Sequence, residues 1–106
     1  MRLNRVEFDE QVLVDIISCD NQPELADTHL SCRTVDISTK GMQVVTDMEL
    51  PVATRLGLFI DLSSSLFRLE GSVRWSRKNG RHFAGLELSP ASPDLDDWSK
   101  MIQLAA

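Results

Sequence analysis

The residues best suited to chemistry lie in one short stretch between two strand-like runs, Asp36-Ile37-Ser38-Thr39-Lys40-Gly41. Asp36 and Ser38 stand at alternate positions, where their side chains can hydrogen-bond to the backbone of their own turn. Gly41 provides either a positive φ or an approach to another backbone that a Cβ would prevent. The exposed N–H groups of such a turn can bind an anion. A well-capped structural turn would need the same residues, so the stretch alone leaves both interpretations open.

Two arginines near the start of the chain, Arg2 and Arg5, could bring positive charge to such a turn. A guanidinium can hold a phosphate through two hydrogen bonds, stack on a base, or bind the O6 and N7 edge of guanine. The two arginines and the turn together would therefore suit a guanine nucleotide. The alternative interpretation is that the arginines only make a frayed terminus more soluble.

One aromatic residue, Trp75, could add a stacking surface for a base. Alternation places Trp75 with Phe67, Leu69 and Val73 on the apolar face of a strand, which favours packing in the core. Lys40 could add charge near a phosphate, although a lysine in an exposed loop is usually only solvated.

An enzyme is not expected from this sequence. Acid–base catalysis needs His, Asp, Glu or Lys side chains that converge in a dry cleft, and here the acidic residues are spread over strand faces. His29 and His82 suit structural or solvent-facing positions better than catalytic ones. A disulfide between Cys19 and Cys32 is geometrically possible, but both fit better as small buried hydrophobic residues. Two Cys and two His without zinc-site spacing predict no metal, and no cofactor is expected.

Length and charge narrow the function further. The 106 residues fit a single domain over residues 1–106 with one hydrophobic core. The net charge of −5 and the pI of about 4.8 argue against binding to DNA or RNA, which needs a basic face. No apolar run reaches membrane-spanning length, so membrane insertion is not expected. The first residues lack the apolar segment of a signal peptide, which predicts a cytoplasmic protein.

The elements that would position these residues are six strands, recognised by apolar residues at every second position. Their expected ranges are 5–18, 30–37, 42–47, 56–62, 67–75 and 82–88. Gly71 suggests a bulge or bend in the fifth strand, and Asn79-Gly80 predicts a type I′ turn before the sixth. Residues 1–5 are expected to form a flexible arm ahead of the first strand.

A helix is predicted over residues 92–104. Ser92 suits the N-cap and Pro93 the first helical position, and acidic residues follow where the helix dipole favours them. Apolar residues then recur at spacings of three and four, namely Leu95, Trp98, Met101, Ile102 and Ala105. The predicted fold class is all-β, a small six-stranded antiparallel β-barrel, closed or nearly closed, with a C-terminal α-helix.

In order along the chain, these features resemble the PilZ domain, a bacterial receptor family for cyclic di-GMP. The family pattern is an N-terminal R-x-x-x-R followed by (D/N)-x-S-x-x-G at a strand turn. Asp36, Ser38 and Gly41 match the second motif in full. The segments 71–75 and 83–88, on either side of Asn79-Gly80, are similar to the last hairpin of the family. The resemblance covers nearly the whole chain and implies a PilZ-like six-stranded β-barrel with a C-terminal helix.

The first motif departs from the family pattern, because Arg2 and Arg5 are three residues apart instead of four. If Arg5 fills the second arginine position, as its neighbour Val6 suggests, the first falls on Met1, and Arg2 is a substitute for it. On an extended arm an offset of one residue turns a side chain to the other side. The residues that the resemblance implies for cyclic di-GMP binding are Arg2, Arg5, Asp36, Ser38 and Gly41, to which Trp75 could add a contact.

The resemblance implies a non-enzymatic receptor module that binds cyclic di-GMP as its ligand. Ordering of the N-terminal arm would then signal to an unidentified bacterial protein partner, with the domain itself a monomer or weak dimer. The alternative is a degenerate PilZ domain that does not bind cyclic di-GMP and acts as an adaptor between proteins. The departure in the arginine motif keeps this alternative open.

Overall fold

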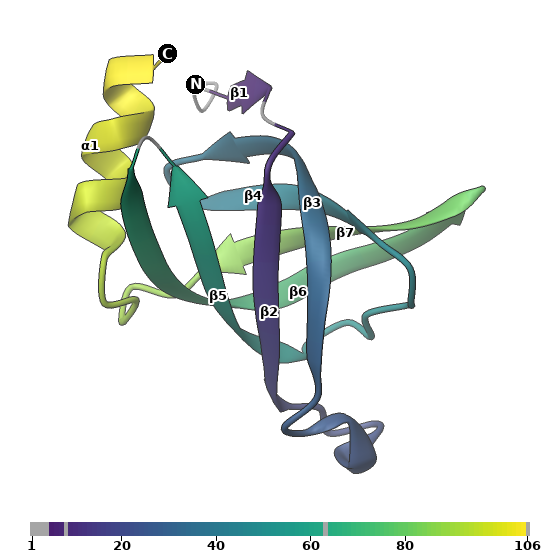
Figure 1. Cartoon of the computed structure of the whole chain (residues 1–106). Coiled ribbons are helices and arrows are strands. Elements are labelled where there is room, and N and C mark those ends of the chain that lie inside the picture. Colours follow the sequence, from purple (N-terminus) through teal and green to yellow (C-terminus); the bar gives the residue numbers. More distant parts are fainter. Residues whose placement is uncertain (1–4, 8, 63, 106) are drawn as a thin grey trace.

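The computed structural model describes residues 5–7, 9–62 and 64–105, and Figure 1 shows their arrangement. Within these ranges the strands are β1 (Arg5–Glu7), β2 (Gln11–Ser18), β3 (His29–Ser38), β4 (Gly41–Thr46), β5 (Arg55–Leu62), β6 (Ser65–Asn79) and β7 (Arg81–Leu88). The helices are the short 3₁₀ helix η1 (Pro23–Leu25) and the α-helix α1 (Leu95–Ala105). None of the helices in the described part of the chain is long and apolar enough to cross a membrane.

The strands form one antiparallel sheet that closes on itself. Its strand order is β1-β3-β2-β5-β6-β7-β4, and β4 also pairs with β3. The six longer strands therefore complete a barrel, and the short β1 lies against the end of β3. This confirms the prediction of an all-β, six-stranded antiparallel barrel with a C-terminal helix.

The prediction of one long first strand over residues 5–18 is wrong. The chain divides into β1 and β2, and both pieces pair with β3. The register passes from Gln11↔Arg33 to Glu7↔Asp36, a change of one residue. The ladder between β3 and β4 shifts at the same place, around Val35. The strand is therefore divided by an irregularity in its partner, which alternation within residues 5–18 cannot reveal.

The core follows the predicted alternation along β2 and β5. The inward side chains, each at most 3% exposed, are Val12, Val14, Ile16, Leu56, Leu58, Ile60 and Leu62. Along β6 the alternation holds only through Val73. The register against β7 shifts between Val73 and Trp75, so that Trp75 is 38% exposed. The prediction that Trp75 packs in the core is therefore wrong, because a bulge interrupts the alternation before it.

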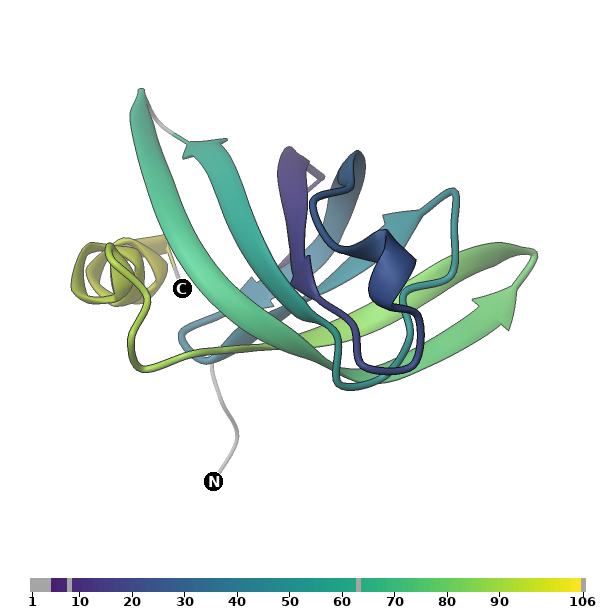
Figure 2. The same ribbon diagram turned by 90° about the horizontal axis from the view of Figure 1, so that it is seen from below.

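Two predictions about the last hairpin need correction. Gly71 lies in a regular register, and the bulge comes after it, at Arg74. The hairpin at Asn79-Gly80 is present, and Figure 2 shows it reaching beyond the rest of the barrel. Its turn is not type I′, which requires a positive φ at two residues. Here Asn79 pairs with Arg81, and only Gly80, with φ 74°, has a positive φ in this turn.

The helix begins at Leu95, three residues later than predicted. The hydroxyl of Ser92 donates to the carbonyl of Glu70 at 2.9 Å and accepts from the amide of the same residue, also at 2.9 Å. Ser92 therefore fastens the chain to β6 instead of capping the helix. Asp94 takes the capping position, since its carbonyl accepts the amide of Trp98 at 2.9 Å. Its carboxylate accepts the amide of Arg68 at 2.7 Å and adds a second link to β6.

Candidate functional site

The turn between β3 and β4 is tight and tied to itself. Strand β3 ends at Ser38 and β4 begins at Gly41, which leaves only Thr39 and Lys40 between them. The Ser38 hydroxyl donates to the carbonyl oxygen of Gly41 at 3.3 Å. The prediction that Ser38 ties the turn to its own backbone is confirmed. Ser38 is only 1% exposed, so its hydroxyl is buried.

Gly41 is required by a close approach between two strands. It pairs with Glu87 in β7, and a Cβ on Gly41 would lie 2.2 Å from the carbonyl oxygen of Leu86. Beside it, the amide of Leu88 donates to the carbonyl oxygen of Lys40 at 2.8 Å. Of the two roles that the sequence left open for Gly41, the structure shows the close approach and not a positive φ.

Helix α1 fastens the same turn from the interior. The indole nitrogen of Trp98 donates to the carbonyl oxygen of Ser38 at 3.0 Å. The Trp98 side chain is fully buried, and its ring meets Phe67 edge to face with centroids 5.5 Å apart. Sequence reasoning missed this contact, because Ser38 and Trp98 are 60 residues apart. The sequence did indicate that Trp98 needs an acceptor, because a buried indole N–H is usually hydrogen-bonded.

A cavity of about 570 Å³ opens beside the turn. Its walls come from the turn, the start of β4, the facing parts of β6 and β7, and the segment from Leu88 to Leu95. Its volume lies in the range typical of small-molecule sites. Ser38, Gly41 and Trp75 line it together. Asp36 does not line it and faces a separate hollow with Glu7 and Asp9.

Trp75 forms an aromatic wall of this cavity. It pairs with Gly85 across the ladder, and a Cβ on Gly85 would lie 2.0 Å from the indole nitrogen. The indole therefore packs directly on the backbone of Gly85, where any side chain would collide with the ring. The guanidinium of Arg77 lies 5.2 Å from the centroid of the ring. Because Trp75 is 38% exposed, part of the ring surface remains open to solvent.

Two cations, Lys40 and Arg74, line the cavity within the described residues. The Arg74 guanidinium lies 3.6 Å from the Glu87 carboxylate, with the two side chains 64% and 56% exposed. An ion pair this exposed is worth at most about 1 kcal/mol. Arg74 can therefore exchange its carboxylate partner for another anion at little cost.

The N-terminal arginines are only partly described. Arg2 lies outside the described residues, as does most of the arm expected over residues 1–5. The backbone of Arg5 belongs to β1, where Arg5 pairs with Ser38. The chain that carries the arginines therefore meets β3 at the residue that begins the turn.

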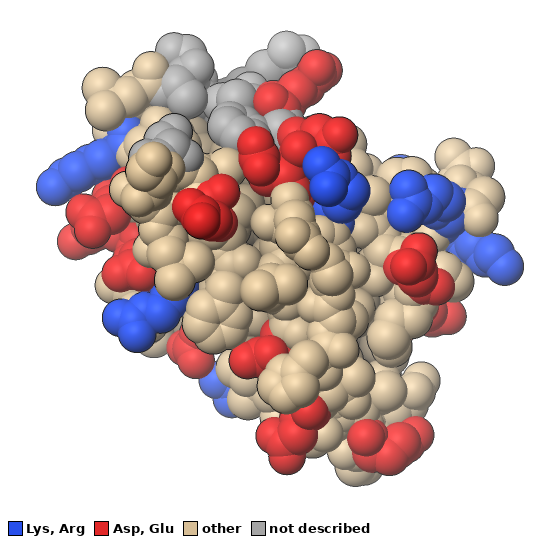
Figure 3. Space-filling view, viewed as in Figure 1, with Lys and Arg blue, Asp and Glu red and all other residues tan. Residues whose placement is uncertain are grey.

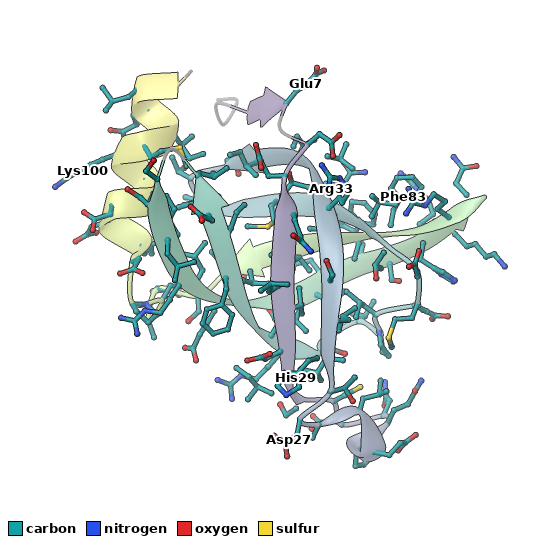
Figure 4. The ribbon with its side chains drawn as sticks, viewed as in Figure 1. Glu7, Asp27, His29, Arg33, Phe83 and Lys100 are labelled. Atoms are coloured by element: carbon teal, nitrogen blue, oxygen red, sulfur yellow. The ribbon has the colours of Figure 1, made fainter. Side chains whose placement is uncertain are left out.

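Cys19, Cys32 and His29 do not line this cavity. Cys19 and Cys32 are buried free thiols, at 4% and 2% exposed. Burial raises the pKa of the Cys32 thiol, so it stays protonated and unreactive near neutral pH. His29 lies on the surface (Figure 4). It is paired with the Asp15 carboxylate. Within residues 5–7, 9–62 and 64–105, no group of three or more His, Cys, Asp or Glu could hold a metal ion.

Comparison with known proteins gives a consistent result. The family model of the PilZ domain matches residues 6–104. The inhibitor of motility MotI/DgrA from Bacillus subtilis is similar in structure, with a TM-score of 0.75 and 16% identity. The similarity covers 99% of this chain, which spans half of the Bacillus protein.

Two structures of YcgR from Escherichia coli are also similar, each over 99% of this chain and with 14% identity. One is the PilZ domain with cyclic di-GMP, at a TM-score of 0.70 and 89% of that chain. The other is YcgR in complex with cyclic di-GMP, at a TM-score of 0.71 and 45% of that chain. Identities this low show a shared fold. The comparison with curated proteins found no match.

Proposed function

Because this chain belongs to the PilZ domain family, we propose that it is a receptor module that binds cyclic di-GMP in the cavity beside the β3–β4 turn. The cavity volume of about 570 Å³ suits a ligand of nucleotide size. Ser38 and Gly41 of the family's second motif both line it. Two similar solved structures, both of YcgR, contain cyclic di-GMP. The proposed module binds its ligand and does not convert it.

The observation that carries the proposal is the pairing of Arg5 with Ser38. This register brings the N-terminal chain to the turn that forms one wall of the cavity. An arm that enters at this point needs only to fold over the cavity to bring Arg2 and Arg5 to an anionic ligand. Ordering of this arm is the proposed signal to a bacterial protein partner.

The cavity suggests a role for each further residue. Arg74 and Lys40 would add charge opposite a phosphate, and Trp75 would stack on a guanine base. Ser38 and Gly41 would shape the turn beneath the ligand. Asp36, which faces the hollow beside β1, would contact the ligand or the arm only after the arm has closed. The module would act in the cytoplasm as a monomer or weak dimer.

Calorimetric titration with cyclic di-GMP, at low and at physiological salt, tests the proposal. We expect saturable binding that weakens about ten- to a hundredfold in Arg5→Ala, because a charged contact worth about 1–3 kcal/mol is lost. Ser38→Ala should also weaken binding, and its melting temperature shows whether the fold is kept. Arg55→Ala is the control, since Arg55 is exposed on β5 outside this cavity. The absence of both heat and a melting shift at ~100 µM ligand would exclude the receptor function.

One observation favours a second candidate function, that of an adaptor between proteins. Arg2 and Arg5 are three residues apart, so on an extended chain their side chains point to opposite sides. A spacing of four would place both on the same side. If this spacing prevents both arginines from reaching one ligand, the folded barrel still offers surfaces to other proteins. If the titration gives no binding heat while the melting curve shows a folded protein, the adaptor function is favoured.

A further inference from the structure

Positive charge is concentrated at one end of the barrel. Residues 74–82, here called the β6–β7 arm, contain Arg74, Arg77, Lys78 and Arg81. These are four of the 11 Lys and Arg residues of the chain, and none of its 16 Asp and Glu residues belongs to the arm. Figure 3 shows basic side chains gathered at this end of the molecule. Two carboxylates from outside the arm approach it among the ion pairs of the described residues: Asp47 lies 3.7 Å from Arg81, and Glu87 lies 3.6 Å from Arg74, with all four side chains exposed.

The β6–β7 arm also has an open strand edge, which belongs to β6. The ladder between β5 and β6 ends at the pair Arg55 and Ser72. Val73 still bonds to the preceding loop, since its amide donates to Thr54 at 3.0 Å and its carbonyl accepts from Ala53 at 2.8 Å. From residue 74 to residue 79, β6 pairs only with β7 in the described part of the chain. A strand edge without a neighbour is a template for pairing with another chain.

Cations lie on both faces of this open edge. Arg77 pairs with Phe83 and lies on the same face as Trp75, where its guanidinium contacts the indole. The next residue, Lys78, pairs with His82 and points to the opposite face. A strand added along this edge would also place its side chains on alternate faces. Carboxylates at successive positions could therefore each meet a cation.

We propose that the open edge of β6 over residues 74–79 docks an extended acidic segment of a partner protein by strand addition. Backbone hydrogen bonds would give affinity, and Arg77 and Lys78 would select for carboxylates. Trp75 and Arg77, which share one face of the β6–β7 arm, are of the residue types that most often carry interface energy. A short peptide segment would contact only the β6–β7 arm. A nucleic acid or an anionic membrane would extend over the acidic remainder of the chain, whose net charge repels it.

Fluorescence anisotropy with a short labelled peptide rich in Glu and Val tests the charge selection. We expect saturable binding that weakens about fivefold or more in Lys78→Glu and in Arg77→Glu, because each reversal turns attraction into repulsion. Lys100→Glu is the matched control, since Lys100 is an exposed lysine on α1 (Figure 4). Unchanged melting temperatures would show that the variants keep their fold. If the peptide does not bind, or if Lys100→Glu weakens it as much as Lys78→Glu, the proposal is wrong.

The same peptide with an N-methyl group on every backbone amide tests the strand addition. It keeps every carboxylate but loses the amide donors on both edges, so we expect its binding to be abolished. Equal binding of the methylated peptide would refute pairing along β6. Tighter binding of a thymidine oligonucleotide, or of phosphatidylserine vesicles, than of the unmodified peptide would refute the assignment to a protein segment.

Discussion

At the scale of single residues, Ser38 and Gly41 are already required by the barrel. The Ser38 hydroxyl holds the turn, and its carbonyl oxygen accepts the indole N–H of Trp98. Gly41 lets β4 approach the backbone of β7 more closely than any other residue would allow. Both residues therefore contribute to stability whether or not a ligand binds. Loss of binding in a variant at either position has to be separated from loss of fold.

Gly41→Ala should destabilise the protein strongly. The new Cβ would fall 2.2 Å from a backbone oxygen that cannot move without disturbing β7. Overpacking of this kind typically costs about 1–3 kcal/mol or more, so the melting temperature should fall by several degrees. Gly57→Ala is the matched control in β5, because the nearest atom to its new Cβ would be 3.8 Å away. Equal melting temperatures for the two variants would contradict the close approach at Gly41.

At the scale of elements, α1 belongs to the core. Trp98 and Ile102 are fully buried, and Ser92 and Asp94 tie the preceding segment to β6. Through Trp98 the helix is hydrogen-bonded directly to the turn beside the cavity. A shift of that turn would therefore break or move a helix contact.

Trp98→Phe should weaken this connection. Phenylalanine keeps the aromatic packing on Phe67, but the Ser38 carbonyl loses its hydrogen-bond donor. The smaller ring also leaves a small void where the indole nitrogen was. An unsatisfied buried acceptor costs about 1–3 kcal/mol, which urea unfolding can measure. Trp75→Phe is the control, because Trp75 is 38% exposed and its indole nitrogen makes no hydrogen bond within the described residues. An equal loss in both variants would mean that ring size, and not the hydrogen bond, determines the effect.

Alternation and turn residues predicted the six strands of the barrel and its terminal helix, because these signals are local. The type I′ turn expected at Asn79-Gly80 is a local error, and the other errors come from contacts between distant segments. The first strand is divided by an irregularity near Val35 in its partner, and Trp75 is turned outward by the bulge at Arg74. The helix starts late because Ser92 bonds to β6 instead of capping it.

The candidate site was only partly predictable from the motif, since Asp36 belongs to the motif but does not line the cavity. Ser38 and Gly41 were identified from the sequence, and both line the cavity. Gly85 and Arg74 were not, since their roles depend on the bulge and on register with β7. The contribution of Trp98 depends on packing between the two ends of the chain. Binding itself stays a prediction for all of them.

At the scale of the whole molecule, barrel and helix share one hydrophobic core. The sheet closes through the pairing of β3 with β4, and a single cluster of buried side chains includes residues from β2 through β7 and from α1. No strand of the closed barrel can leave without exposing this cluster. We therefore expect a single unfolding transition.

Urea unfolding followed by far-ultraviolet and near-ultraviolet circular dichroism tests this expectation. The far-ultraviolet signal reports the strands and helix, and the near-ultraviolet signal reports aromatic packing such as that of Trp98 on Phe67. The two curves should have the same midpoint. An earlier loss of the near-ultraviolet signal would show that α1 detaches before the barrel opens.

The two tryptophans of the chain lie in different surroundings, so their intrinsic fluorescence should report ligand binding without a label. Trp98 is enclosed and should emit at short wavelength, beyond the reach of a quencher such as acrylamide. Trp75 is 38% exposed on the cavity wall and should emit further to the red. A molecule that settles against that wall would dim or shift only the red component. The blue component stays as an internal standard, so occupancy can be read from unlabelled protein in a single spectrum.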